Sequence, residues 1–174
     1  LGALYANQFP TRVRALVLDG PVDPALDATK AQVQQAAGFE HSLDLFLHDC
    51  AMHPSCAFWS GGHPGRAYAR LRKRIARSPI RANQSGKGRV LNATLFDIGV
   101  TLVLYQGHAA WSSLASALAA AQKDNGSQLL DFSDQYTGRS FDGTYDNGQE
   151  AFIAIGCADG PPVGNLKQMR VIED

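Results

Sequence analysis

The chain opens with two short apolar segments separated by a turn. Residues 1–9 are mostly small and apolar and end at Phe9-Pro10, which predicts the second half of a helix. The compact apolar run 13–18, which ends at Asp19-Gly20, predicts a buried strand. Because parallel strands are joined by crossover helices that cover a sheet, an earlier strand is expected before this helix. The chain is therefore expected to begin inside an α/β domain.

A different pattern begins at Asp27. From Asp27 to Met52 apolar residues recur at steps of three and four, which predicts one face of a long amphipathic helix. Asp27 is the expected N-cap, and His53-Pro54 is expected to end the helix. The apolar positions are Val33, Ala36, Phe39, Leu43, Phe46, Leu47 and Cys50.

Further helices follow, with little sheet between them. A capping box, Thr94-Leu95-Phe96-Asp97, predicts the start of one of them, and Gly107 its end. No second βαβ unit is predicted, so the fold class is α/β, with one helix-strand remnant of a core followed by a mainly α-helical region. Helices are expected over 65–77, 94–106, 111–121 and 127–136, with a short hairpin over 78–92, a loop over 137–147 and a last apolar element over 149–160.

Several of these segments carry a resemblance to a known family. They are LGALYANQFP at 1–10, VLDGPVDP at 17–24, Trp-x-x-Leu-Ala-x-Ala-Leu from Trp111, and Ala-Ile-x-Cys-x-Asp at 154–159. Together they resemble the secreted tripeptidyl aminopeptidases, which are α/β-hydrolases of the S33 family of serine peptidases. The resemblance covers nearly the whole chain and is weakest over 78–92.

This resemblance implies a division of the chain and a location for the catalytic residues. Residues 1–26 would be a remnant of the hydrolase core, and 27–174 a helical cap inserted into its sheet. The nucleophile elbow would lie roughly five residues before Leu1, and the catalytic acid and histidine beyond Asp174. No serine here lies in Gly-x-Ser-x-Gly, so no catalytic residue is expected within the chain and no hydrolysis by the chain alone.

The implied function is that of a secreted serine exopeptidase that removes short peptides or single residues from substrate N-termini. One alternative is another capped α/β-hydrolase, acting on an ester, an epoxide or a related small molecule, which would differ only in its pocket residues. A second alternative is a helical binding module without catalysis. The enzyme interpretations predict a strand and Gly-x-Ser-x-Gly upstream of Leu1, whereas the module predicts a proper start there. No cofactor is implied.

Acidic residues are candidates for substrate binding. An exopeptidase must offset the desolvation of the substrate's terminal ammonium, and carboxylates of the cap can do so. Glu150 and Asp159 are the candidates, against a solvated Glu150 and an Asp159 that caps its own turn. Asp19 closes the predicted strand, where a minority of α/β-hydrolases keep their catalytic acid. The resemblance places that acid elsewhere, so Asp19 and Asp23 are expected to be turn residues.

Two cysteines, Cys50 and Cys56, lie close together around a turn that contains proline. They can close a disulfide loop worth about 2 kcal/mol, which favours an oxidising compartment, or remain free thiols in a cytosolic protein. With His48, His53 and His63 they also imitate a zinc cluster, although the spacing fits no standard finger. The resemblance favours the disulfide over a metal site, and an extracytoplasmic location. Because Cys50 and Cys56 are then paired with each other, Cys157 is expected to pair outside the chain.

Charge argues against one class of partner. The 16 basic and 16 acidic residues give a formal net charge of zero, so no net field favours nucleic acid or an anionic membrane surface. Six basic residues of the predicted helix 65–77 are spread around its circumference without interleaved aromatics, which favours a solvated face over an anion site. No apolar run reaches the roughly eighteen residues that span a bilayer. The expected partner is a peptide N-terminus, not nucleic acid.

Overall fold

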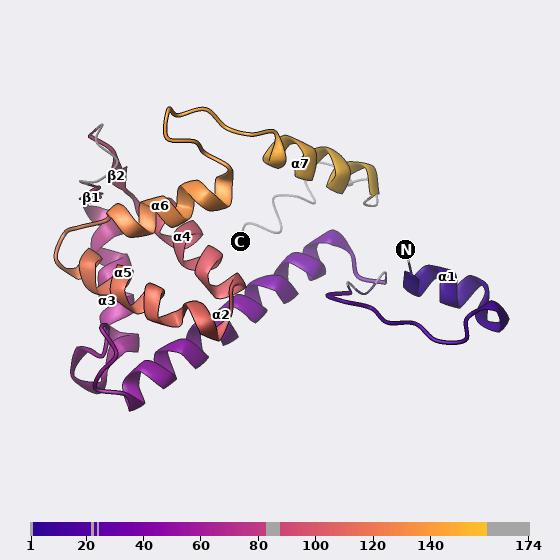
Figure 1. Cartoon of the computed structure of the whole chain (residues 1–174), viewed down its shortest axis with the longest axis horizontal. Coiled ribbons are helices and arrows are strands. Elements are labelled where there is room, and N and C mark those ends of the chain that lie inside the picture. Colours follow the sequence, from indigo (N-terminus) through magenta and orange to yellow (C-terminus); the bar gives the residue numbers. More distant parts are fainter. Residues whose placement is uncertain (1, 22, 24, 83–87, 160–174) are drawn as a thin grey trace. The chain divides into compact units, whose positions relative to one another are not determined.

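The computed structural model of the chain describes residues 2–21, 23, 25–82 and 88–159. The chain divides into two compact units, Leu1–Ala37 with Ile155–Asp174, and Gly38–Ala154. The larger unit is built mainly of helices (Figure 1). Among the described residues there is one sheet, of two short strands, so the predicted mainly helical body is confirmed. The boundary between residues 26 and 27 stays a prediction.

The smaller unit holds the predicted N-terminal helix without a strand after it. Helix α1 spans Gly2–Gln8, and the one-turn helix η1 spans Pro10–Arg12. Leu18 packs on α1, where a Cβ added to Gly2 would come within 2.9 Å of it, whereas the preceding Val17 is 95% exposed. This alternation suits a strand, but the buried strand predicted here is wrong for this structure. A strand is completed by neighbours that share its backbone hydrogen bonds, and the described part of the chain places none beside it.

Helix α2, Ala28–Met52, begins after its predicted cap and ends at its predicted stop. The Asp27 carboxylate accepts a hydrogen bond from the backbone N–H of Lys30 at 2.8 Å, and this bond lowers the pKa of Asp27. The predicted apolar face is buried at Leu43, Phe46 and Cys50, whereas Val33 is 63% exposed. The C-terminal half of the apolar face therefore belongs to the core of the larger unit.

Helix α3, Pro64–Arg77, follows the one-turn helix η2, Ser60–Gly62. Pro64 lies in the first turn, where its missing N–H breaks no helical hydrogen bond. Leu71 and Ile75 are buried, as the apolar spacing predicts. The remaining positions of α3 are largely charged and exposed, so this helix covers the core with one face only.

The predicted hairpin is confirmed as strands β1, Ile80–Arg81, and β2, Val90–Leu91, which pair antiparallel. Its central residues, 83–87, lie outside the described residues. Arg89 binds both carboxylate oxygens of Asp134 in the later helix α6, Ser127–Thr137, with Nη2 to Oδ1 at 2.8 Å. This hydrogen bonding raises the pKa of the guanidinium. The short hairpin is thereby tied to the helical body.

Helix α4, Ala93–Tyr105, starts earlier than predicted. Its N-cap is Asn92, whose side-chain oxygen accepts the backbone N–H of Leu95 at 2.9 Å. The predicted capping box led by Thr94 is therefore wrong. Asp97, its expected last member, instead accepts two hydrogen bonds from Arg72 of α3, at 2.8 and 2.7 Å.

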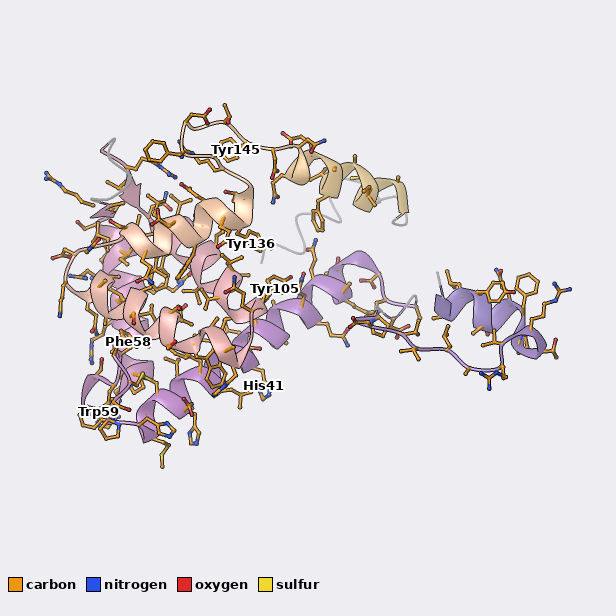
Figure 2. The ribbon with its side chains drawn as sticks, in the orientation of Figure 1. His41, Phe58, Trp59, Tyr105, Tyr136 and Tyr145 are labelled. Atoms are coloured by element: carbon orange, nitrogen blue, oxygen red, sulfur yellow. A yellow bond between two sulfur atoms is a disulfide. The ribbon has the colours of Figure 1, made fainter. Side chains whose placement is uncertain are left out.

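The C-terminal half of the chain follows the predicted order. Gly138, at φ 67°, ends α6 in the left-handed conformation that glycine adopts most readily. The rings of Tyr105 and Tyr136, at the C-terminal ends of α4 and α6, stack with centroids 6.2 Å apart (Figure 2). The elements are η3, His108–Ala110; α5, Trp111–Gln122; α6, Ser127–Thr137; and α7, Gly148–Asp159.

Helices α4 and α6 approach each other closely at Gly99. A Cβ added to Gly99 would lie 2.3 Å from the backbone oxygen of Leu129, so only glycine allows this contact. Helix α5 packs against both helices, and α3 against α4 and α5. Large side chains that are almost fully buried fill the space between them, namely Phe46, Phe58, Phe96, Ile75, Leu91, Leu114, Leu118, Leu129 and Leu130.

The predicted disulfide between Cys50 and Cys56 is present, with their Cα atoms 5.4 Å apart. It closes the loop that follows α2, and Phe58, two residues after this loop, is fully buried (Figure 2). A hydrogen bond also holds this region to α2, because the indole N–H of Trp59 donates to the backbone oxygen of Ala51 at 3.1 Å. Cys157 is free and exposed, and its pairing outside the chain stays a prediction.

The contact at Gly99 predicts a large effect for a small substitution. Gly99→Ala should lower the free energy of unfolding by roughly 2 kcal/mol or more, because backbone atoms must move apart to admit the methyl group. Gly38→Ala, in the exposed middle of α2 with nothing within 4 Å of the new Cβ, should raise it by about 0.5–1 kcal/mol. Urea unfolding followed by circular dichroism measures both. Equal effects of the two substitutions would contradict the close approach.

The disulfide predicts a thiol count. Chain unfolded without reductant should expose one free thiol, that of Cys157. Adding reductant should lower the stability of the folded chain by about 2 kcal/mol, because the loop no longer restricts the unfolded state. Titration with Ellman's reagent gives the count, and three reactive thiols or bound zinc would contradict it.

Candidate functional site

The predicted substrate-binding carboxylates lie on one helix. Glu150 is exposed in the first turn of α7, and Asp159 is the last residue of that helix, with a side chain outside the described residues. Positions nine apart on an α-helix lie about half a turn out of register and roughly 13 Å apart along its axis. The backbone of α7 therefore does not bring these two positions to one point.

The other acidic candidates are turn residues. Asp23 accepts the backbone N–H of Ala25 at 2.9 Å, as expected of an Asx turn. Asp19 is exposed and precedes Gly20, which has φ 58°. Neither arrangement resembles the buried, hydrogen-bonded carboxylate that orients a catalytic histidine.

The cluster that imitates a zinc site is held together differently. Both sulfur atoms are consumed by the Cys50–Cys56 disulfide, so neither is available as a thiolate ligand. His53 contacts Asp49 one turn earlier, with Nδ1 2.7 Å from its backbone oxygen and 3.3 Å from its carboxylate. Within the described residues, three or more His, Cys, Asp or Glu side chains nowhere gather closely enough to hold a metal ion.

A first groove, of about 770 Å³, lies at the C-terminal end of α2 beside the disulfide loop and the start of α5. Its wall is aromatic. Trp111 contacts Phe46 edge-on at 5.9 Å between centroids, and His108 at 4.6 Å. The lining residues are Phe46, Asp49, His53, Ser55, Cys56, Ala57, His108, Ala109, Trp111, Ser112, Ala115 and Ser116.

This groove contains the residue types of a catalytic triad without its geometry. The Asp49 and His53 side chains are 42% and 62% exposed, so water screens their interaction. Ser116 donates its hydroxyl to the backbone oxygen of Ser112 at 2.9 Å, and no serine hydrogen-bonds His53 in the described part of the chain. A serine nucleophile is activated by a hydrogen bond to an adjacent general base, and neither His53 nor His108 makes one to a serine among the described residues. The groove can hold a ligand but does not activate a nucleophile.

A second groove, of about 600 Å³, lies between α2, α3 and α4. Its lining combines apolar side chains with three carboxylates and one guanidinium. The carboxylates are Glu40, Asp44 and Asp97. The apolar side chains are Phe39, Leu43, Leu47, Val100 and Leu104, with the ring of Tyr68.

The second groove has a negative balance of charge. Its one cation is Arg72, which donates hydrogen bonds from Nε and Nη2 to the two carboxylate oxygens of Asp97. These hydrogen bonds raise the pKa of the guanidinium. Glu40 and Asp44 are left without an ion-pair partner among the described residues. Two carboxylates beside an apolar wall suit a cation attached to an apolar group, because the wall lowers the local dielectric constant.

Glu40 and Asp44 were not predicted as site residues from the sequence, although their spacing gave a signal that they lie beside a groove. They are four residues apart and adjacent to the predicted buried positions Phe39 and Leu43 on the same helix. Residues so placed flank the buried face, where side chains reach the rim of a groove. Which helices form the opposite wall follows only from the packing of α3 and α4 on α2.

The chain is similar to named hydrolases. It is 34% identical over 174 residues to serine protease Hip1 of Mycobacterium tuberculosis H37Rv, covering 94% of this chain and 32% of that protein. It is 33% identical over 157 residues to carboxylesterase B of the same strain, covering 89% and 29%. Putative hydrolase YuaR of Escherichia coli K12 is 27% identical over 121 residues, 68% of this chain and 23% of that protein. No family model matches the chain.

These similarities concern a part of longer proteins. The chain spans about a third of the length of the first of the curated relatives it matches. Both mycobacterial alignments include most of the helices that form the two grooves, because they cover 94% and 89% of the chain. None of the described helices is long and apolar enough to cross a membrane.

Tyr68 in the second groove predicts a pH dependence of stability. Burial, and then the charge of Asp97, raises the pKa of the Tyr68 phenol above its ordinary value of 10.0. Folding therefore favours the neutral phenol. Its contribution to the free energy of unfolding is complete below pH 10 and is lost as the pH rises above that value. The melting temperature should fall less for Tyr68→Phe than for the unchanged chain between about pH 9 and pH 11.

Tyr5→Phe is the control for this measurement, because it removes an exposed hydroxyl from the other unit. Thermal melts followed by circular dichroism compare the three chains. If the melting temperature falls equally at alkaline pH for Tyr68→Phe and for the unchanged chain, the Tyr68 phenol titrates alike in the folded and the unfolded state.

Proposed function

We propose that this chain is the cap and part of the core of a serine hydrolase that releases short peptides or single residues from the N-termini of peptides. The observation that carries the proposal is the 34% identity to a protein named serine protease Hip1 along 94% of the chain. The aminopeptidase type is the finer part of the proposal. It rests on the motif resemblance at 1–10, 17–24 and 154–159 and on the acidic second groove.

In this proposal residues 1–26 belong to the hydrolase core and 27–174 to the cap. The segment after η1 supports this division, because Leu18 packs on α1 while Val17 faces solvent, as in a strand that lacks its neighbours. The remaining strands, the serine elbow, the acid and the histidine would come from the longer protein. Asp49, His53 and the serines of the first groove then have a binding role only.

The second groove is the proposed seat of the substrate's terminal ammonium. Removing that charge from water costs several kcal/mol, which a pair of carboxylates can offset. Glu40 and Asp44 would supply the pair, and Leu43 with Leu47, which line the same groove, would contact the first side chain of the peptide. The ion pair would fix the N-terminus at a set distance from the nucleophile, and this distance would determine how many residues are released. Glu150 and Asp159 remain the alternative holders of the ammonium.

A second candidate function is esterase activity. It is favoured by the 33% identity to a protein named carboxylesterase B over 89% of the chain. An ester substrate carries no terminal ammonium, so Glu40 and Asp44 would then have no substrate charge to bind. The two candidates share the serine chemistry and differ in what the second groove recognises.

An extracytoplasmic location is part of the proposal. The Cys50–Cys56 bond supports it, because disulfides form and persist in oxidising compartments. The bond closes the loop that carries Ser55 and Cys56 into the first groove. Oxidation would thus also stabilise one wall of the cap.

The proposed division predicts where activity is found. The 174-residue chain should hydrolyse neither peptide p-nitroanilides nor p-nitrophenyl esters above background, and a fluorophosphonate probe should not label it. The longer protein encoded in the same reading frame should be labelled once per molecule. Gel fluorescence with mass spectrometry identifies the labelled serine, and a labelled serine within the 174 residues would contradict the assignment.

Substrate recognition is tested in the longer protein with Glu40→Gln and Asp44→Asn combined. The variant should raise KM for peptide p-nitroanilides with a free N-terminus by about 10- to 100-fold and leave ester hydrolysis unchanged. Asp131→Asn, an exposed carboxylate on α6 outside both grooves, is the matched control. An enzyme that cleaves esters but no peptides would favour the esterase. An effect of Glu150→Gln alone would move the ammonium site to α7.

A further inference from the structure

Helix α3 carries a set of charges that the proposed function does not use. Its 14 residues include six basic side chains and no acidic one. Arg72 binds Asp97, and Arg74 binds Asp124 at 2.8 Å and the backbone oxygen of Ala121 at 2.8 Å. The other four are exposed and form no ion pair with a described residue, namely Arg66, Arg70, Lys73 and Arg77.

These four cations form one row. They follow one another at steps of four, three and four residues, which on a helix of about 3.6 residues per turn keeps them on a single side, over roughly 16 Å of axis. Arg72 and Arg74 are the two basic residues that lie off this line, and both are paired. Taken together, the six basic residues predict charges spread around the helix. Pairing of two of them leaves a single cationic row.

The row is fixed in its orientation. Pro64, Ala67, Leu71 and Ile75 are buried on the opposite side of α3, so the helix cannot turn without exposing the core. The guanidinium of Arg72 is held on one flank by both oxygens of Asp97. These contacts also engage a carboxylate that would otherwise compete for the row. The four cations are therefore arranged in advance for an external partner.

The shape of the row selects the kind of partner. None of the four side chains lines either groove, and the row extends over roughly 16 Å of helix axis, so it suits an extended anionic face rather than a small anion. The one aromatic residue of α3, Tyr68, lines the second groove and not the row, so α3 offers the bases of single-stranded nucleic acid no ring beside the cations to stack on. The apolar face of α3 is already buried, so binding would be electrostatic and at the surface.

We propose that α3 docks along the surface of an anionic lipid bilayer, with Arg66, Arg70, Lys73 and Arg77 at the level of the headgroup phosphates. The negative surface potential of such a bilayer attracts each cation within about one Debye length, roughly 10 Å in moderate salt. A zero net charge does not prevent this, because the cations are concentrated on one helix that has no acidic residue of its own. The proposal is independent of the peptidase assignment and concerns a different surface.

Vesicle co-sedimentation of the full 174-residue chain tests the proposal. The chain should bind vesicles of equal parts phosphatidylglycerol and phosphatidylcholine, and not phosphatidylcholine alone, and binding should decline as salt rises from about 50 to about 500 mM. Changing all four cations to glutamine should lower the partition coefficient at least about 100-fold. The matched control changes Arg12, Arg14, Lys30 and Lys123 to glutamine, which removes the same charge from other surfaces and should retain most of the binding.

Two further variants keep the result decisive. Arg66→Lys, Arg70→Lys and Arg77→Lys combined should bind like the unchanged chain, because a surface potential responds to charge and not to the guanidinium fork. If the fourfold variant loses its helical circular dichroism, Arg66→Gln and Arg77→Gln singly should each lower binding about fivefold. Equal binding by the fourfold variant, equal binding to neutral vesicles, or tighter binding of the row to an oligonucleotide would overturn the proposal.

Discussion

The backbone contact between Gly99 of α4 and Leu129 of α6 sets the geometry of the helical unit. At this point the two helices are closer than any side chain permits, since a single methyl group at Gly99 would meet a carbonyl oxygen at 2.3 Å. The approach lets α5 pack against both helices at once and places the buried leucines of α5 and α6 in one core. Helices α2 and α3 then cover the opposite side of α4, and the second groove lies between them.

Charged pairs position the surfaces around this core. Arg72 on Asp97 joins α3 to α4, Arg74 joins α3 to the end of α5, and Arg89 joins the hairpin to α6. Partly exposed pairs of this kind contribute little to stability. Their effect is to neutralise charges, so that they decide which charged side chains of the surface are left unpaired. What remains is a groove with unpaired carboxylates on one side of α3 and a row of unpaired cations on the other.

This separation gives the chain two surfaces of opposite character around one helix. The groove joins negative charge to an apolar wall, as a site for an amine with an attached side chain requires. The row places positive charge along an exposed polar helix face, as a site for an extended anion requires. A cap that holds its substrate on one face and rests on a membrane by another would act at the bilayer surface, where both proposals can hold together or fail separately.

The sequence by itself determined the local structure. Apolar spacing, Asp27, Pro54 and the glycines near helix ends were sufficient for most helix bounds, because these signals act within a few residues. The separation of Cys50 and Cys56 allowed a disulfide loop, and the family resemblance favoured it over free thiols or a metal site. Tertiary packing decided the rest. Asn92 and not Thr94 caps α4, and Asp97 binds Arg72 of another helix instead of closing a capping box. Residues 13–18 formed no strand because strands need neighbours. Only the packing of helices distant in sequence decided which charges are paired, because a charge is neutralised by what lies next to it in space. Among the described residues it left Glu40, Asp44 and the cationic row without ion pairs, and the proposals for them depend on this.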